Sequence, residues 1–191
     1  MSLTLHNEVE ALSVGVLEID GLSVWEPTAA MEAWMQEQCQ RAKESTASEA
    51  WDARREAVRG LLRKGGYKPS GRNKPAQEYL LRCLSEGNFP RIHPAVDCLN
   101  AISVRIGLPI SMLTRDRFPD SIRLRLGRPG EKYVFNSVGH ELELEDLIVV
   151  CGGVEGNEPL GSPVKDSMAG KDYRDGPIDR VYLICARCCG F

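Results

Sequence analysis

The spacing of the apolar residues changes near Arg117, and this change limits the choice of fold more than any other feature. Before it, the segment 76–85 places apolar residues three or four positions apart, as one face of a helix does. After it, the segment 122–126 alternates apolar residues with arginines, which is the period of a half-buried strand. A chain with helices first and strands later is expected to form an α+β fold around one sheet.

The same patterns predict the individual elements. Thr46 and Glu49 have the spacing of a capping box and predict a helix start, and Gly107 with Pro109 predicts a helix stop. We expect helices over 28–40, 46–63, 76–85 and 94–106, buried strands over 11–19, 147–151 and 181–185, and a hairpin that pairs 122–126 with 133–135.

Length and charge set limits on organisation and partners. The 191 residues suit a single domain over 1–191, with 28–64 as a helical N-terminal segment. The formal net charge of -3 lacks the basic excess of DNA-binding proteins, so DNA is not expected as a partner and any RNA contact is expected to be local. No apolar run reaches the ~18–20 residues that cross a bilayer, and the N-terminus shows no signal-peptide pattern, so we expect a cytoplasmic protein without a membrane partner.

The seven cysteines are expected to be reduced thiols. Cys185, Cys188 and Cys189 form a cluster in which two thiolates at suitable spacing could share a metal ion. A tetrahedral site needs four ligands, and no Cys or His pair of matching spacing lies elsewhere in the sequence. We therefore expect neither a metal site nor a cofactor.

Polar residues in three places are candidates for function. Lys165, Asp166 and Ser167 put a base, an acid and a hydroxyl on a loop between strands, where sites are common, although a polar turn explains them equally. Asp97 and Asn100 share one face of a helix; the structural alternative is that Asp97 caps the helix and Asn100 bonds a neighbouring backbone group. The loop 68–75 carries three cations and no acid, as a phosphate-contacting loop or a plain linker would.

Two of these features recur together in a known family. The chain has Val-Asp-x-x-Asn at 96–100, within a segment 89–100 that is followed by Gly-Leu-Pro-Ile at 107–110. With Gly130-Glu131 and Gly139 further along, this order resembles the tRNA-editing module of the beta subunit of bacterial phenylalanyl-tRNA synthetase. The resemblance covers roughly 66–186, and it implies a single domain with a mixed, mostly antiparallel sheet packed with helices.

In that family, the module hydrolyses the ester of a wrongly attached amino acid on tRNA. The resemblance therefore implies a stand-alone deacylase that edits aminoacyl-tRNA in trans, with Asn100 and Ser111 orienting the ester or water and Asp166 accepting a proton. Asp97, Lys165, Ser167 and Ile184 are the residues expected to line the substrate.

The chain departs from the family pattern at two of these positions. A family histidine falls at Ser111, and the glutamate that recognises a tyrosine hydroxyl falls at Ile184, so the ligand is expected to be apolar on that side. The departures favour a rival hypothesis, a binding module for an amino acid or the aminoacylated end of RNA without turnover. A third hypothesis is an interaction domain that docks a partner protein through helices carrying Trp34 and Trp51.

Overall fold

The computed structural model describes residues 4–10, 12–22, 26–119 and 121–171, together with the backbone of 178–188. Within these residues the chain forms a single α+β domain. Its helices are α1 (Ala29–Ser45), α2 (Glu49–Arg63), α3 (Ala76–Ser85) and α4 (Pro94–Ile106). Its strands are β1 (Thr4–Asn7), β2 (Leu12–Leu22), β3 (Ile110–Thr114), β4 (Ser121–Leu126), β5 (Lys132–Val134), β6 (Glu141–Glu143), β7 (Ile148–Gly152), β8 (Glu158–Gly161) and β9 (Ile178–Cys188).

The helices begin and end where side chains and glycine satisfy the terminal backbone groups. The Thr28 hydroxyl accepts a hydrogen bond from the Met31 amide at 3.2 Å and starts α1. His93 caps α4 through its Nδ1 atom, and Gly107 ends that helix in the left-handed conformation, at φ 69°. The predicted bounds of α3 and α4 are therefore confirmed.

The predicted capping box of α2 is wrong. Thr46 ends α1 instead, and its hydroxyl donates to the Lys43 carbonyl at 2.7 Å. Ser48 is the residue that caps α2, because its hydroxyl accepts from the Trp51 amide at 3.3 Å. A hydroxyl close to the end of the preceding helix can bond the free carbonyl groups there. Local spacing alone therefore did not show which of Thr46 and Ser48 caps α2.

The strands form separate hydrogen-bonded sheets rather than the one sheet expected. A four-stranded mixed sheet has the order β1-β4-β7-β8, in which β1 and β4 are parallel and the other neighbours antiparallel. An antiparallel sheet has the order β2-β9-β3. The predicted hairpin is also wrong, because β4 pairs with β7 while β5 pairs with β6. As expected, β7 and β9 are central strands.

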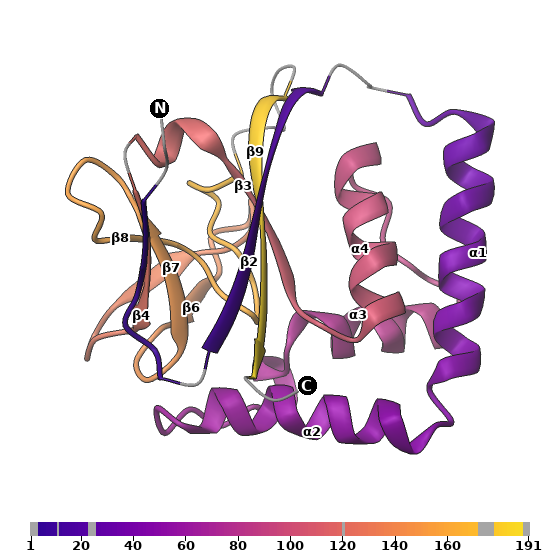
Figure 1. The fold of residues 1–191 in the computed structure, drawn as a ribbon, viewed down its shortest axis with the longest axis horizontal. Helices are drawn as coiled ribbons and strands as arrows, with labels where there is room; N and C mark the ends of the chain where they lie inside the picture. The colour runs from indigo at the N-terminus through magenta and orange to yellow at the C-terminus, as the bar shows by residue number, and fades with distance from the viewer. Residues whose placement is uncertain (1–3, 11, 23–25, 120, 172–177, 189–191) are drawn as a thin grey trace.

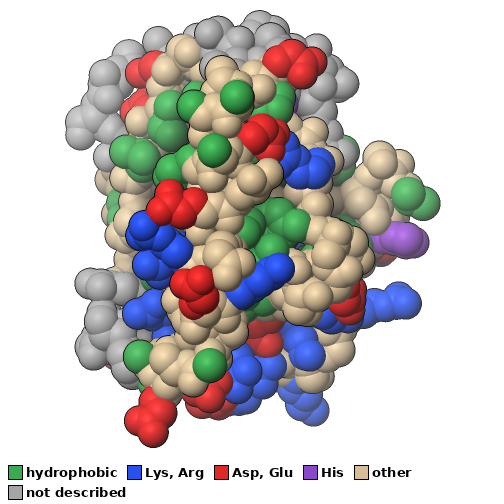
Figure 2. Space-filling view, turned by 90° about the vertical axis from the view of Figure 1, so that its right-hand side faces the viewer, with side chains coloured by type: hydrophobic (Ala, Val, Ile, Leu, Met, Phe, Trp, Pro, Cys, Tyr) green, Lys and Arg blue, Asp and Glu red, His purple; other side chains and the backbone are tan. Residues whose placement is uncertain are grey.

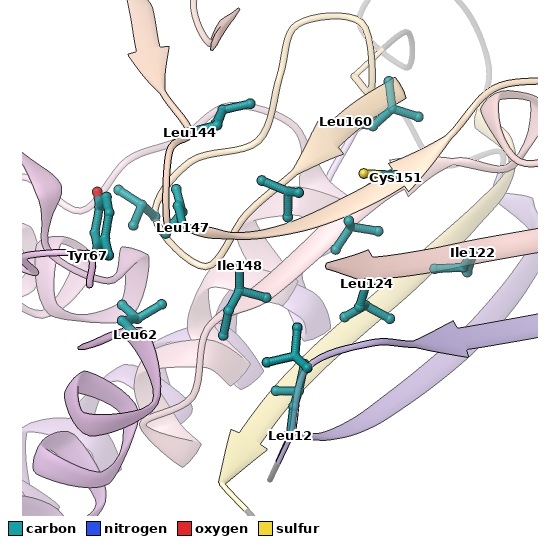
Figure 3. Packing of buried hydrophobic residues seen from close by; sticks show 14 of the residues in the cluster. Leu12, Leu62, Tyr67, Ile122, Leu124, Leu144, Leu147, Ile148, Cys151 and Leu160 are labelled. Carbon is teal, nitrogen blue, oxygen red and sulfur yellow. The ribbon is translucent and has the colours of Figure 1, made fainter. Parts of the chain in front are cut away.

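The two larger sheets and the helices form layers (Figure 1). The β2-β9-β3 sheet lies in the middle, with α4 and α1 on one side and the four-stranded sheet on the other, while α2 runs across the lower end. Figure 3 shows the main core, in which Leu62 of α2 lies near Ile148 of β7 and Tyr67 lies near Leu147. No helix among the described residues is long and apolar enough to cross a membrane.

A buried ion pair holds the turn that follows β4. Both terminal nitrogens of Arg125 bond the Glu131 carboxylate at 2.7 Å, and the Arg125 side chain is only 5% exposed. Arg125 also donates to the carbonyls of Leu126 and Asn157, each at 3.0 Å. The hydrogen bonds from Arg125 hold the pKa of Glu131 below its ordinary value, despite the opposing effect of burial.

We predict that Glu131→Gln lowers the free energy of unfolding by about 3 kcal/mol at neutral pH, because it leaves the buried Arg125 charge uncompensated. Since the pKa of Glu131 is lowered in the folded state, this stabilisation is present above the unfolded-state value of about 4.3 and is lost as pH falls through the folded-state value. Urea unfolding of both proteins across this range measures the effect.

The matched control is Glu141→Gln, which breaks the exposed pair with Lys132. It is expected to cost less than about 1 kcal/mol. Equal losses for the two variants would show that the Arg125 pair contributes no more than a surface contact.

Candidate functional site

Ser111 of β3 and Asp166 of the loop between β8 and β9 meet in the folded chain. The Ser111 hydroxyl donates to Oδ1 of Asp166 at 2.7 Å, and the Ser162 amide donates to the same oxygen at 3.2 Å. The backbone amide of Met112 is a further donor to this carboxylate. Ser111 is buried, whereas Asp166 as a residue keeps some exposed surface. These contacts hold a carboxylate and a hydroxyl together at the edge of the core.

Burial dominates the electrostatics of Asp166. Removal of its carboxyl group from water raises the pKa of Asp166 above its ordinary value. The charge of Lys171 and the hydrogen bonds from Ser111, Ser162 and Met112 act in the opposite direction without cancelling this effect. A carboxylate with a raised pKa is a stronger base than an exposed aspartate.

The loop itself is ordered by local hydrogen bonds. The Ser162 hydroxyl accepts from the amides of Val164 and Lys165 and donates to the Lys165 carbonyl. The hydroxyl of buried Ser167 accepts from the Gly170 amide at 3.0 Å, while its own amide donates to the Leu160 carbonyl at 2.9 Å. Ser167 therefore has a structural role that shapes the turn carrying Asp166.

Two glycines allow the loop to approach the sheet. A Cβ atom at Gly161 would lie 2.9 Å from Oδ1 of Asp166, and one at Gly170 would lie 2.7 Å from a Leu113 methyl. Real Cβ atoms do not tolerate such separations, so any larger residue would displace the carboxylate or the side chain of β3. The position of Asp166 thus depends on these two glycines.

Lys165 lies beside the carboxylate in sequence, but its ammonium faces other groups. Its Nζ atom lies 4.2 Å from the centroid of the Phe135 ring and 3.4 Å from the carbonyl oxygen of Arg72. Partial burial lowers the pKa of Lys165, and the nearby charge of Arg72 lowers it further. Lys165 therefore links the Asp166 loop to the segment between α2 and α3.

Two tyrosines and a glutamine complete the polar surroundings. The Tyr133 hydroxyl donates to the Lys165 carbonyl, and burial, with the charge of Asp166, raises the pKa of Tyr133 well above its ordinary value. Burial raises the pKa of Tyr67 to about 12, and its hydroxyl has no hydrogen-bond partner among the described residues. Gln77 is 2% exposed, and both polar atoms of its side chain also lack a partner within this part of the chain, although its helix starts against the Pro163 carbonyl.

An unpartnered buried polar group costs about 1–3 kcal/mol, so folds rarely keep two near one loop without a functional reason. Tyr67, Phe135, Ser162 and Gln77 were not predicted as site residues, because nothing in their local spacing marks them. The only available sequence signal was the turn at Pro159–Pro163, which placed Ser162 near the candidate loop without assigning it a role.

Asn100 does not join this group. Met112 of β3 packs against Val96 and Leu99 of α4, whereas Ser111, the preceding residue, faces Asp166. Successive strand residues point to opposite faces, so the β2-β9-β3 sheet separates α4 from the Asp166 loop (Figure 1). The structure therefore places Asn100 on the helix that covers the opposite face from Ser111.

Asp97 is also engaged in structure. Its carboxylate accepts from the amides of Ile92 and His93 at 2.8 and 3.3 Å and lies 3.3 Å from Nε of Arg91. Arg91 in turn pairs with Glu32 of α1. The capping alternative explains Asp97, which binds the start of α4 to α1 rather than lining a site.

The remaining predicted residues fall in β9 or beyond it. The backbone of Ile184 lies opposite Ser111 in the antiparallel register, while its side chain lies outside the described residues. The side chains of Cys185 and Cys188, and all of Cys189, are likewise outside them. Within the described part of the chain, no group of three or more His, Cys, Asp and Glu side chains is arranged to hold a metal ion.

No protein-family model matches the chain, and no curated protein matches it at a significant level.

We predict that Asp166→Asn changes how stability depends on pH. Because the folded-state pKa of Asp166 is raised, the acid form is favoured on folding, and the wild type loses stability as pH rises from about 4 through the folded-state value. The variant has no carboxyl group to ionise at position 166. Its free energy of unfolding, measured by urea unfolding, should therefore rise relative to that of wild type as pH increases over this range.

Asp52→Asn, on the exposed face of α2, is the matched control and should show no such trend. A wild type that gains stability over the variant with rising pH would mean that the folded protein prefers the Asp166 carboxylate in its ionised form.

Proposed function

We propose that this protein is a stand-alone deacylase that hydrolyses the ester between an amino acid and tRNA. The observation that carries the proposal is the hydrogen bond between Ser111 and Asp166, which places a buried carboxylate beside a hydroxyl at two positions implicated by the family resemblance. We place the protein in the cytoplasm, where it would encounter its proposed substrate, aminoacyl-tRNA.

Asp166 supplies the base in this proposal. Water attacks the ester carbonyl carbon while Asp166 accepts its proton, the bond from that carbon to the ribose oxygen breaks, and the ribose oxygen takes up a proton. Burial strengthens the base by raising its pKa, and the hydrogen bonds from Ser111 and Ser162 hold its Oδ1 atom in place.

Position 184 is isoleucine, so no acidic side chain is available there to bind a hydroxyl group of the substrate. The register of β9 and β3 sets the backbone of that residue directly across from Ser111. An amino-acid side chain bound at this point is best matched if it is apolar, because a hydroxyl would lose its hydrogen bonds to water without replacement.

A binding module without turnover is the second candidate, and the position of Asn100 favours it. The constellation expected for catalysis is divided between two faces of a sheet, which separates the Asn100 side chain from Ser111 and Asp166. In this alternative the same loop binds the aminoacylated end of RNA, and the Asp166 hydrogen bonds serve only to shape it.

The test incubates the purified protein with tRNAs that carry labelled matched or mismatched amino acids and follows loss of the ester. We predict that wild type accelerates hydrolysis of one class over buffer, and that Asp166→Asn lowers the rate by about 10²-fold or more, as loss of a general base does. The enzyme-dependent rate should fall as pH falls through the raised pKa of Asp166, because a protonated carboxyl group accepts no proton.

Asp52→Asn serves again as the exposed control and should retain the wild-type rate. Binding without hydrolysis across the panel would contradict the deacylase and support the binding module. Loss of activity in Asn100→Ala with retention in Asp166→Asn would contradict this site, because it would move the chemistry to the α4 face.

A further inference from the structure

The longest stretch of the chain without an acidic residue lies between Glu56 and Glu78, close to the candidate site. It contains six lysines and arginines in a protein whose net charge is -3. Two of the six lie on α2 and are paired, Arg59 with Glu78 and Arg63 with Glu56. The unpaired cations lie beyond the end of that helix.

Five basic residues, here called the basic rim, lie in the α2–α3 connection and on the Asp166 loop that contacts it. They share the absence of an ion pair with any described acidic side chain, and the four in the α2–α3 connection are exposed. The members are Lys64, Lys68, Arg72, Lys74 and Lys165.

The surface of the helical layer differs from the basic rim. Acidic and basic side chains are interspersed over the face that α1 presents, with basic ones more frequent toward its lower edge (Figure 2). Arg41 pairs with Glu37 on α1 and Arg55 with Asp52 on α2, four and three residues apart. The α2–α3 connection instead carries four basic residues and no acidic residue of its own, and the Asp146 carboxylate lies against it at Gly66.

The fold also brings two of these cations, Lys165 and Arg72, together. Lys165 reaches from the Asp166 loop to within 3.4 Å of the Arg72 carbonyl oxygen, and the charge of Arg72 acts against its own. Like charges at close range repel, more so where water is partly excluded. A bound anion would reverse this repulsion, since it would interact favourably with both groups.

The backbone that presents the cations is ordered. Pro69 and Pro75 are buried, the Asn73 amide donates to the Ser70 carbonyl at 2.9 Å within a 3₁₀ turn, and the Ala76 amide bonds the Pro163 carbonyl. An open pocket of about 310 Å³ lies at the start of this segment and is lined by Arg63, Gly66, Tyr67, Lys68, Pro69 and Ser70. An ordered loop loses less conformational entropy when it binds a ligand.

We propose that the basic rim binds the phosphodiester backbone of a single-stranded nucleic acid, the RNA that carries the ester in the proposed function. Lys165 adjoins Asp166 in sequence, and its Nζ atom lies 3.4 Å from the Arg72 carbonyl oxygen, so a strand lying along the rim would reach the loop that carries the carboxylate. Exposed lysines and arginines bind phosphates without reading sequence, and a row of them suits successive phosphates of a polymer. This inference rests on the proposed function for the identity of the strand.

The test measures fluorescence anisotropy of a labelled single-stranded RNA of about 12 nucleotides, a length within the range that one domain covers. If four phosphates are neutralised, affinity should fall about fiftyfold between 50 and 200 mM salt. The triple variant Lys68→Gln, Arg72→Gln, Lys74→Gln should weaken binding on the order of 100-fold at 0.1 M salt and reduce the logarithmic salt slope by about 2.

The matched control is Arg41→Gln, Lys43→Gln, Arg55→Gln, which removes the same charge from exposed positions on α1 and α2. Its affinity for RNA should stay within about twofold of the wild-type affinity, once the general effect of net charge on association is taken into account. Thermal unfolding of both variants shows whether each is folded before affinities are compared.

Equal loss in the two triple variants, or no RNA binding by the wild type, would overturn the proposal. A mononucleotide that binds as tightly as the oligonucleotide would also overturn it, since the rim would then hold one phosphate group rather than a chain. Hydrolysis of aminoacyl-tRNA that is unchanged in the rim variant at low tRNA concentration would overturn the rim while leaving the deacylase standing. RNA binding that depends on the rim, without hydrolysis, would support the rim and contradict the deacylase.

Discussion

The backbone hydrogen bonds of β9 are the interaction on which the rest of the structure depends. This strand pairs with β2, near the start of the chain, on one edge and with β3, from its middle, on the other. Both partners are therefore held by a strand that follows them by many residues, and the sheet exists only when distant parts of the chain have come together. Its two faces define the helical layer and the layer that contains the candidate site (Figure 1).

A sheet with both faces covered gives neighbouring residues of one strand different roles. In β3, Met112 packs against the helix α4, whereas Ser111 bonds Asp166 on the other side. The hydroxyl is held by residues of the core, and the carboxylate is held by a loop that two glycines allow to approach closely. The geometry of the Ser111 and Asp166 pair is thus a consequence of strand alternation and of tight loop packing.

The candidate site combines a buried acidic residue with exposed basic residues. Burial makes Asp166 a stronger base, and Lys165, the preceding residue, connects its loop to the cations of the α2–α3 segment. This arrangement explains how a chain of net negative charge would attract a polyanion to one place. Under our proposals, the basic rim binds the strand and the carboxylate acts on its end.

The sequence by itself determined the helices of the middle region, the central positions of β7 and β9 and the α+β class, because apolar spacing and glycine or proline stops act over a few residues. It also identified Ser111 and Asp166 as residues of interest. Only the tertiary structure decided that they meet and that Asn100 lies across the sheet from them. Strand pairing over long separations decided these points, including the partner of β4, and local sequence carries no direct record of such pairing.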